Sequence, residues 1–147
     1  MVTIRFAKRG DEKAIHELIV GLAIFEKAES EVINTPENLA KDLFDEKICH
    51  AYVAEVDGLI VGFALWYTSY STWKGQCLYL EDFYVHPDYR NQKIGSLLFD
   101  KVVDLAKENG VKRMDWQVLD WNENAIEFYK RKNATLDPEW LNGRLFF

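Results

Sequence analysis

Apolar residues in the first part of the chain follow first a helical and then an alternating spacing. Residues 2–7 alternate briefly and predict a short strand. After Asp11, apolar residues recur every three or four positions and predict a helix with one apolar stripe: Ile15, Leu18, Ile19, Leu22 and Phe25. Acids break the stripe in EKAESEVINT, which predicts a loop. Thr35-Pro36-Glu37 then combines a capping hydroxyl, a proline and an acid, and predicts a second helix that buries Leu39, Leu43 and Phe44.

From residue 50 the pattern predicts strands. HAYVAEV (50–56) and LIVGFALWYTSY (59–70) flank Asp57-Gly58, a signal for a tight hairpin with a primed turn. CLYLEDFYV (77–85) is a third strand. The helix after it ends at Asn109-Gly110 and is predicted to bury Ile94, Leu97, Leu98, Val102, Leu105 and Ala106.

The last part of the chain predicts a strand at 111–119, a short helix capped by Asn122, and a further hairpin at Asn142-Gly143. A strand, a helix and a strand within this length form a right-handed crossover, so the two strands should be parallel. The element order predicts a single α+β domain over 1–147, with a mixed, mostly antiparallel sheet, a central parallel strand-helix-strand crossover and helices on both faces.

Composition limits the classes of function. The chain has 147 residues, 48% hydrophobic and 29% charged, as expected of a soluble globular domain. A net charge of −6 argues against non-specific nucleic-acid binding. No apolar run approaches the ~20 residues of a membrane span, so we expect no membrane partner. Cys49 and Cys77 lack metal-site spacing and are predicted to be free thiols rather than a disulfide, which favours a cytoplasmic location. Three scattered histidines predict no metal site.

The loop RNQKIG (90–95) lies between a predicted strand and a predicted helix. The first turn of a helix presents unpaired N–H groups and attracts anions such as phosphate. Arg90 and Lys93 add positive charge, and Gly95 permits a close approach of the backbone. The alternative is an ordinary solvated basic turn at a helix start.

The spacing of this loop resembles the acetyl-CoA loop of the GNAT acetyltransferase family, Gln/Arg-x-x-Gly-x-Gly/Ala. Arg90 and Gly95 match its first and last positions, whereas Lys93 stands where the middle glycine is expected. If this position has a positive φ, a lysine there costs ~1 kcal/mol. Its charge would instead favour the pyrophosphate, so its net effect on acetyl-CoA binding stays open.

Further stretches resemble the diamine acetyltransferase branch of that family, the spermidine/spermine and thialysine N-acetyltransferases. They are IVGFALWY, LYLEDFYV, DYRNQKIGS, WNENAIEFYKRKNA and WLNGRLFF. The resemblance implies the GNAT fold and an acetyl-CoA-dependent, metal-free N-acetyltransferase of a small amine. It also implies a homodimer and direct attack of the amine in a ternary complex. The family does not reveal which amine is used.

The resemblance implies a catalytic role for two residues. Tyr129 matches the tyrosine that protonates the coenzyme A sulfur, and a phenol with a pKa of ~10 holds the necessary proton at neutral pH. Glu81 matches the carboxylate that takes the proton of the amine through a water molecule. A purely structural tyrosine and a solvated Glu81–Asp82 pair are the alternatives. Neighbouring strand residues face opposite sides of a sheet, so Glu81 and Asp82 share a pocket only if a bulge intervenes.

The resemblance also assigns binding residues. Those expected to hold the cofactor are Phe83, Tyr84, Val85, Arg90, Asn91, Gln92, Lys93, Ile94, Gly95, Ser96, Asn122, Glu123, Asn124, Ala125 and Tyr129. Those expected at the substrate are Phe25, Glu26, Trp73, Glu81, Asp82, Asp115, Trp116 and Gln117. Trp116 has a core position as its alternative. For Glu29 and Glu31 a solvated loop is slightly favoured over the pocket.

Two other functions fit the sequence. A peptide or protein acetyltransferase would use the same chemistry on a larger substrate. A non-catalytic module that senses acyl-CoA or polyamines is favoured by Lys93, because decay of the loop would weaken cofactor binding. Retention of Glu81 and Tyr129 argues against it.

Overall fold

A computed structural model describes all residues of the chain, 1–147. The chain forms two compact units, Met1–Trp116 and Gln117–Phe147, which are described separately. The prediction of a single domain over 1–147 stays a prediction.

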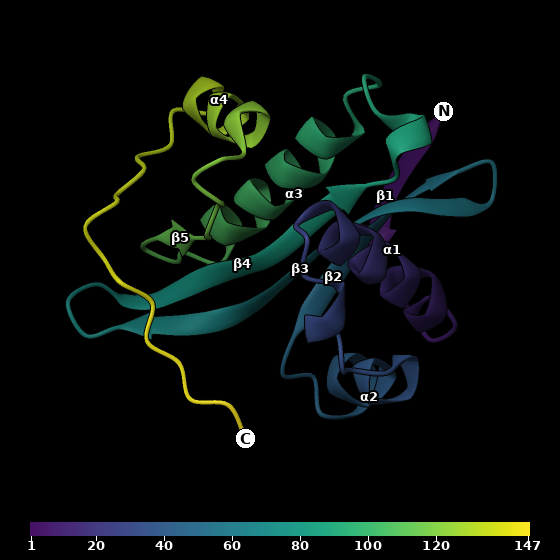
Figure 1. Cartoon of the computed structure of the whole chain (residues 1–147), viewed down its shortest axis with the longest axis horizontal. Coiled ribbons are helices and arrows are strands. Elements are labelled where there is room, and N and C mark those ends of the chain that lie inside the picture. Colours follow the sequence, from purple (N-terminus) through teal and green to yellow (C-terminus); the bar gives the residue numbers. More distant parts are fainter. The chain divides into compact units, whose positions relative to one another are not determined.

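The first unit contains one five-stranded sheet in the order β1-β2-β3-β4-β5 (Figure 1). Its strands are β1 (Val2–Phe6), β2 (His50–Val56), β3 (Leu59–Ser71), β4 (Gly75–Val85) and β5 (Met114–Asp115). The first four pair antiparallel, and β4 and β5 pair parallel. The predicted α+β class and the parallel strand-helix-strand crossover are therefore confirmed, but the parallel pair lies at one edge of the sheet and not at its centre, because β5 pairs with β4 alone.

Helices α1 (Glu12–Phe25) and α3 (Ile94–Glu108) cover opposite faces of this sheet (Figure 1). On the α1 face, Val53 and Phe63 pack in one buried cluster with Ile15. On the α3 face, Phe83 packs against Phe99, with ring centroids 5.8 Å apart. The alternating strand residues thus supply both layers of the core.

The second helical segment joins the α1 layer. It consists of α2 (Pro36–Ala40), which Thr35 caps by accepting a hydrogen bond from the Asn38 N–H at 3.1 Å, and a π-helical turn over Lys41–Asp45. A short 3₁₀ turn, Glu29–Glu31, lies between α1 and α2. The predicted cap and its proline are confirmed.

The β2–β3 hairpin has the predicted turn. Asp57 and Gly58 have φ values of 50° and 80°, the pair of positive angles that a type I′ turn requires. The pairing of Val56 with Leu59 closes the hairpin directly around these two residues.

Two predictions within the first unit are wrong. The strand expected over 111–119 is reduced to Met114–Asp115, because strand pairing with β4 is limited to Leu78 and Tyr79. Leu97, expected in the buried stripe of α3, is 44% exposed, since the buried stripe continues from Ile94 through Leu98 and Val102 and Leu97 lies outside it.

The second unit contains one helix, α4 (Glu123–Arg131). The Asn122 side chain accepts a hydrogen bond from the Ala125 N–H at 3.3 Å, which confirms the predicted cap. The hairpin predicted at Asn142-Gly143 is wrong, because residues 132–147 form no strand. Neither residue has the positive φ that a primed turn needs.

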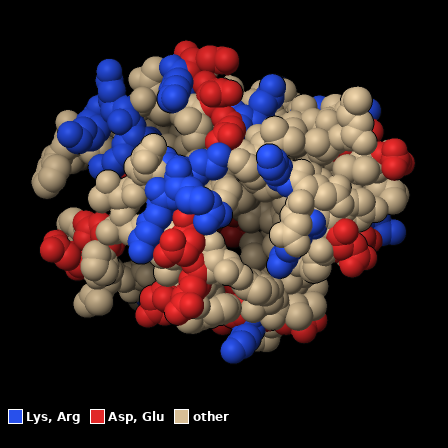
Figure 2. Space-filling view, turned by 90° about the horizontal axis from the view of Figure 1, so that it is seen from above, with Lys and Arg blue, Asp and Glu red and all other residues tan.

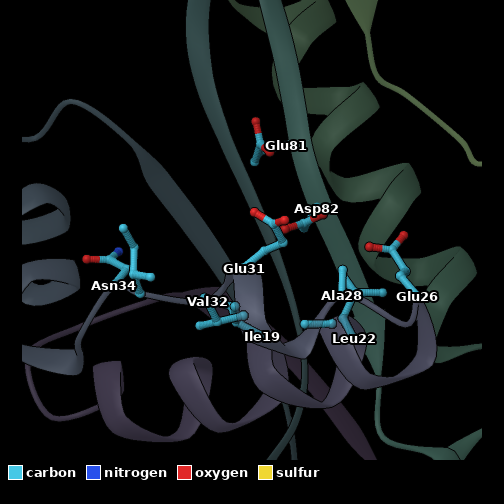
Figure 3. A pocket seen from close by; sticks show the side chains of 11 residues that line it. Ile19, Leu22, Glu26, Ala28, Glu31, Val32, Asn34, Glu81 and Asp82 are labelled. Atoms are coloured by element: carbon cyan, nitrogen blue, oxygen red, sulfur yellow. The ribbon is translucent and has the colours of Figure 1, made fainter. Parts of the chain in front are cut away.

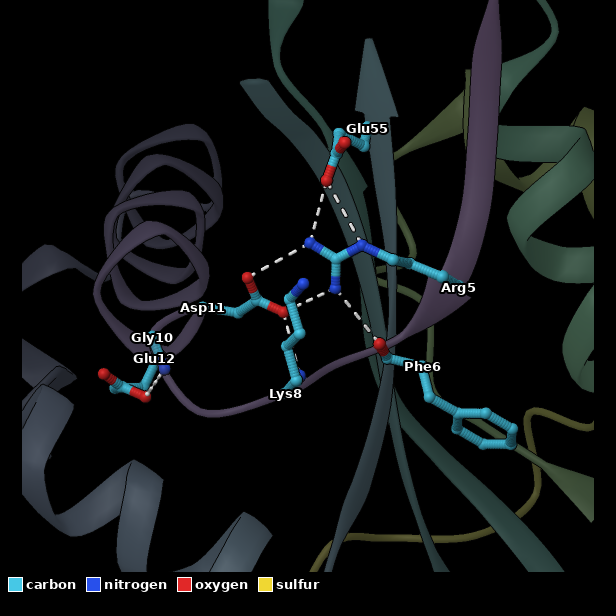
Figure 4. Close-up of polar contacts among 7 residues, drawn as sticks. All are labelled: Arg5, Phe6, Lys8, Gly10, Asp11, Glu12 and Glu55. Carbon is cyan, nitrogen blue, oxygen red and sulfur yellow. Dashed lines mark hydrogen bonds and ion pairs between the residues drawn. The ribbon is translucent and has the colours of Figure 1, made fainter. Parts of the chain in front are cut away.

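A charged cluster ties α1 to the sheet (Figure 4). Arg5 on β1 donates to the Asp11 carboxylate at 2.7 Å and to Glu55 on β2 at 2.8 Å. Asp11 is only 6% exposed and also accepts from the Lys8 N–H at 2.8 Å. Burial favours the neutral acid, but the hydrogen bonds and positive charge of Arg5 and Lys8 outweigh it and lower the pKa of Asp11.

Candidate active site

A pocket of about 360 Å³ lies in the first unit between the end of α1, the turn that follows it and β4. Its apolar lining comes from α1 and the segment after it: Ile19, Leu22, Ala23, Ala28, Val32 and Ile33. Asn34 and four acids complete the lining: Glu26, Glu31, Glu81 and Asp82 (Figure 3). No basic residue lines the pocket, so its polar surface is strongly acidic.

A β-bulge places Glu81 and Asp82 on the same wall. Leu65 of β3 pairs with Asp82 and Trp66 pairs with Leu80, which leaves Glu81 as an extra residue of β4. An extra residue interrupts the alternation of a strand, so two consecutive side chains emerge on one face. The condition under which the two acids could share a pocket is therefore met.

The pocket acids lack a positive partner within the protein. Their side chains take part in none of the hydrogen bonds or ion pairs of the structure. Burial, followed by the like charges of Glu81 and Glu26, raises the pKa of Asp82 to about 7. Burial also raises the pKa of Glu26. A cation entering the pocket would relieve this repulsion.

Two stacked tyrosines continue the α1 face of the sheet beside Glu81. Tyr67 and Tyr79 are cross-strand partners with ring centroids 5.2 Å apart. Burial and then the charge of Glu81 raise the pKa of both hydroxyls, that of Tyr79 to about 12. Both phenols therefore stay protonated at neutral pH and can donate hydrogen bonds.

The loop before α3 has left-handed backbone at two non-glycine residues. Asn91 has φ 65° and Lys93 has φ 63° and ψ 14°. Asparagine tolerates this region, but for lysine it costs on the order of 1 kcal/mol. The departure from the family pattern therefore falls on a position whose backbone does favour glycine.

Helix α3 begins without the side-chain cap that α2 and α4 have; α1 also lacks such a cap but has an acid, Glu12, in its first turn. Thr35 caps α2 and Asn122 caps α4 through side-chain oxygens, whereas Lys93 supplies no such cap to α3. The first turn of α3 also has no acid. With Gly95 in that turn, the start of this fifteen-residue helix suits an external anionic group.

Beyond the bulge, β4 has an open edge on its β5 side. Its β5 partners are Leu78 and Tyr79, whereas the strand partners of Phe83, Tyr84 and Val85 lie on β3. Arg90 folds back over this end of the strand, donating from Nε to the Val85 carbonyl at 3.2 Å. Its guanidinium lies 5.3 Å from the Tyr84 ring centroid and 5.7 Å from that of Phe25.

Several residues predicted at the substrate lie away from the pocket lining. Phe25 contacts Arg90 instead, and Trp73 is 87% exposed in the β3–β4 turn. Asp115 forms an ion pair with Arg113 at 2.8 Å. Trp116 packs edge-on against Phe99, the core alternative left open for it.

The remaining predicted residues belong to the second unit. Gln117 donates a hydrogen bond to Asn142. Glu123, Asn124 and Ala125 form the first turn of α4 after the Asn122 cap. Tyr129 is the buried residue of this helix, 6% exposed, and its ring meets Phe128 edge-on.

Sequence reasoning missed most of the apolar pocket lining. Ile19 and Leu22 were assigned to the apolar stripe of α1, and nothing in the periodicity separates core positions from a pocket floor. For Glu31 a solvated loop was slightly favoured over the pocket, whereas the structure places it in the lining. The only available signal was its position within an acid-rich segment directly after the first helix.

Three further observations concern surface charge, helix composition and possible metal-binding groups. The face seen in Figure 2 carries acidic and basic side chains side by side, without a continuous basic surface. None of the helices combines the length and apolar character that a membrane crossing needs. No group of three or more His, Cys, Asp or Glu residues is arranged to hold a metal ion.

A model of the acetyltransferase (GNAT) family matches residues 13–133, most of the chain. The chain therefore belongs to the GNAT acetyltransferase family, and it is an N-acetyltransferase. The five-stranded mixed sheet with helices on both faces is the fold of that family.

Named relatives agree with this assignment. A thialysine N-epsilon-acetyltransferase of Bos taurus is 43% identical over 142 residues, covering 90% of this chain and 84% of that protein. Spermidine/spermine N(1)-acetyltransferase-like protein 1 of Homo sapiens is 34% identical over 89% of this chain and 20% of that protein. A possible acetyltransferase from Clostridium difficile 630 shares the fold, with a TM-score of 0.82, 22% identity and coverage of 100% and 99%.

Proposed function

We propose that the protein transfers the acetyl group of acetyl-CoA to a primary amine of a small polyamine, diamine or thialysine-like amino acid. The observation that carries this proposal is the pocket in which Glu26, Glu31, Glu81 and Asp82 surround an apolar floor without any basic partner. An alkylammonium ion offers the complementary charge, and its methylene groups match the apolar floor.

The chemistry requires the amine to lose a proton before it attacks. At neutral pH an alkylamine with a pKa of ~10.4 is protonated and not nucleophilic. Glu81 and Asp82 stand side by side in the pocket wall, where they attract the ammonium group. Glu81 then accepts its proton through a water molecule, and Asp82 keeps the nitrogen in place.

Acetyl-CoA supplies the activated acetyl group when bound. The uncapped start of α3, with Asn91 to Ser96, would hold its pyrophosphate, and Arg90 and Lys93 add positive charge. The open edge of β4 at Phe83, Tyr84 and Val85 is suited to pair with the amide groups of the pantetheine arm, as an added strand would. The first turn of α4, Asn122 to Ala125, is proposed as a further cofactor contact.

Tyr129 is proposed as the acid. The amine nitrogen forms a bond to the acetyl carbon while the carbon–sulfur bond breaks, in one complex of enzyme and both substrates. The leaving thiolate takes the phenolic proton, and the product is the acetylated amine and coenzyme A. The resemblance of WNENAIEFYKR to the family supports this role, and so does the presence of a phenol at a buried position of α4.

The resemblance further supports a homodimer and a cytoplasmic location, and both are included in the proposal. Free thiols at Cys49 and Cys77 are compatible with a reducing compartment. Trp73, Asp115, Trp116 and Gln117 keep their proposed places near the substrate only on the strength of the resemblance.

The test is release of coenzyme A thiol from acetyl-CoA with spermidine, spermine, putrescine, thialysine and lysine offered in turn. We expect turnover with at least one amine, and Tyr129→Phe should reduce kcat by at least about a hundredfold while acetyl-CoA still binds. Tyr89→Phe, a tyrosine in the turn before the loop, serves as the control.

Three outcomes would contradict the proposal or part of it. Acetyl-CoA binding without turnover of any amine or basic peptide would favour a sensor of acyl-CoA. Turnover of basic peptides alone would assign the protein to the peptide acetyltransferases. Full activity of Tyr129→Phe would remove that residue from the mechanism.

A further inference from the structure

Glu31 differs from the other pocket acids in its origin. Glu81 and Asp82 come from the rigid sheet and Glu26 ends α1, whereas Glu31 closes the short 3₁₀ turn that follows. In Figure 3 its carboxyl group rises from this turn toward the Asp82 side of the pocket, while Glu26 lies at the other side. The four acids therefore reach the pocket from three different segments of the chain.

Glu31 is also free of internal partners. It forms no hydrogen bond or ion pair through its side chain, and no lysine or arginine lines the pocket beside it. The apolar residues Val32 and Ile33 follow it directly and form part of the same lining. A cation held by Glu31 would thus have its carbon chain in contact with apolar surface.

We infer that Glu31 determines specificity for amines that carry a second positive charge, by receiving the ammonium group that does not react. The inference rests on the proposed function, since it takes Glu81 and Asp82 as the place of the reacting nitrogen. A monoamine fills the reacting end equally well but has no group for Glu31. A change at Glu31 should therefore alter the preference for a doubly charged amine without altering the acetyl transfer itself.

The neighbouring Glu29 provides a matched control. It belongs to the same turn, Glu29–Glu31, and is exposed like Glu31, but it does not line the pocket. Replacing either by glutamine removes one negative charge from the same short segment. A general effect of the protein's field on cations would therefore appear in both variants, and a specific contact only in Glu31→Gln.

The experiment compares 1,4-diaminobutane with 1-aminobutane as acetyl acceptors. We expect kcat/KM for the diamine, relative to the monoamine, to fall about fivefold in Glu31→Gln, the size of one solvent-accessible ion pair. The loss should appear in KM for the diamine, Glu29→Gln should keep the wild-type ratio, and Glu31→Asp should retain part of it. A ratio that changes less than about twofold, or an equal fall in Glu29→Gln, overturns the inference.

Failure of the proposed function has a different signature. It would show as absence of thiol release by the wild-type protein with both amines. Calorimetric binding of the same two amines to wild-type protein, Glu31→Gln and Glu29→Gln then tests Glu31 without turnover. Diamine binding that weakens only in Glu31→Gln supports the inference, and equal affinities in all three proteins overturn it.

Discussion

Two groups of acids in the first unit each include a carboxyl group with little exposure to solvent, Asp11 and Asp82, but differ in charge balance. At the start of α1, Asp11 and Glu55 surround Arg5, and the pKa of Asp11 is lowered. In the pocket, Asp82 has acids for neighbours and its pKa is raised to about 7. Burial acts in the same direction in both, so the difference comes from the presence or absence of a cation. The first group helps to hold α1 against the sheet, and the second is where we propose that the amine substrate supplies the missing cation.

The largest change in the free energy of unfolding is expected from breaking the cluster of Arg5, Asp11 and Glu55. Asp11→Ala leaves Arg5 without its buried partner and should lower the free energy of unfolding by about 3 kcal/mol. Asp45→Ala, which breaks an exposed ion pair with Arg9, should cost less than about 1 kcal/mol. Urea denaturation of both variants measures the difference.

The pH dependence of this effect has a definite sign. The pKa of Asp11 is lower in the folded than in the unfolded state, so its stabilisation is complete above an unfolded pKa of ~3.9. It is lost as the pH falls through the folded value. A penalty for Asp11→Ala that persists unchanged at pH 2 would show that lost packing, rather than charge, explains the effect.

The second effect has the opposite sign. Asp82→Asn removes a carboxyl group that is costly to ionise in the folded protein, and should raise the free energy of unfolding at pH 8 by roughly 2 kcal/mol. The full shift of about three pKa units corresponds to about 4 kcal/mol, which we halve because solvent reaches the pocket.

The gain from Asp82→Asn should depend on pH in the following way. The folded pKa of about 7 lies above the unfolded value, so the folded protein binds more protons between the two and loses stability as the pH rises through this window. At pH 3 the variant and the wild-type protein should be equally stable. Glu17→Gln, an exposed position on α1, is the control, and a destabilised Asp82→Asn would mean that Asp82 is balanced by a cation after all.

The third effect concerns ligand binding. A diamine stays doubly charged below pH 9, whereas Asp82 must ionise to attract it. As the pH rises toward 7, the dissociation constant of the diamine should therefore fall by up to about tenfold per pH unit. Above pH 7 it should stay constant. Calorimetry with 1,4-diaminobutane from pH 5.5 to 8.5 measures this slope. A flat profile in the wild-type protein would separate diamine binding from Asp82, and Asp82→Asn should show the flat profile.

The smallest effect is expected from screening. At low salt, Glu26→Gln should raise the free energy of unfolding by less than about 1 kcal/mol, because one of the repelling charges is removed. In 0.5 M NaCl, with its ~4 Å Debye length, the difference should disappear. A gain that is equal at both salt concentrations would point to packing of the glutamine instead.

The sequence alone predicted most of the fold because its signals were local. The Asp57-Gly58 turn, the Thr35 and Asn122 caps and the periodicity of α1 each depend on a few neighbouring residues. The signal failed at 111–119 and at Asn142-Gly143, where strand formation depends on a partner elsewhere in the chain. Apolar alternation and a turn dipeptide cannot reveal whether that partner exists.

The sequence predicted most of the acidic residues of the candidate site, but not the geometry that brings them together. Glu26, Glu81 and Asp82 were named from the family resemblance, and all three line the pocket. The bulge that brings Glu81 and Asp82 to one wall depends on the register between β3 and β4, which the sequence of β4 does not contain. The role of Ile19 as pocket floor depends in the same way on where the segment after α1 turns.

The bulge at Glu81 also changes which alternate residues of β4 face the α1 layer. Before it, odd-numbered residues such as Tyr79 face the α1 layer, and after it even-numbered ones such as Tyr84 do so. Without Glu81, Leu80 would join directly to Asp82 and the alternation would run unbroken through the strand, every other side chain keeping its face. Glu81 is in this sense an insertion that the sheet does not need, so a shortened strand could keep the fold while losing one acid of the pocket.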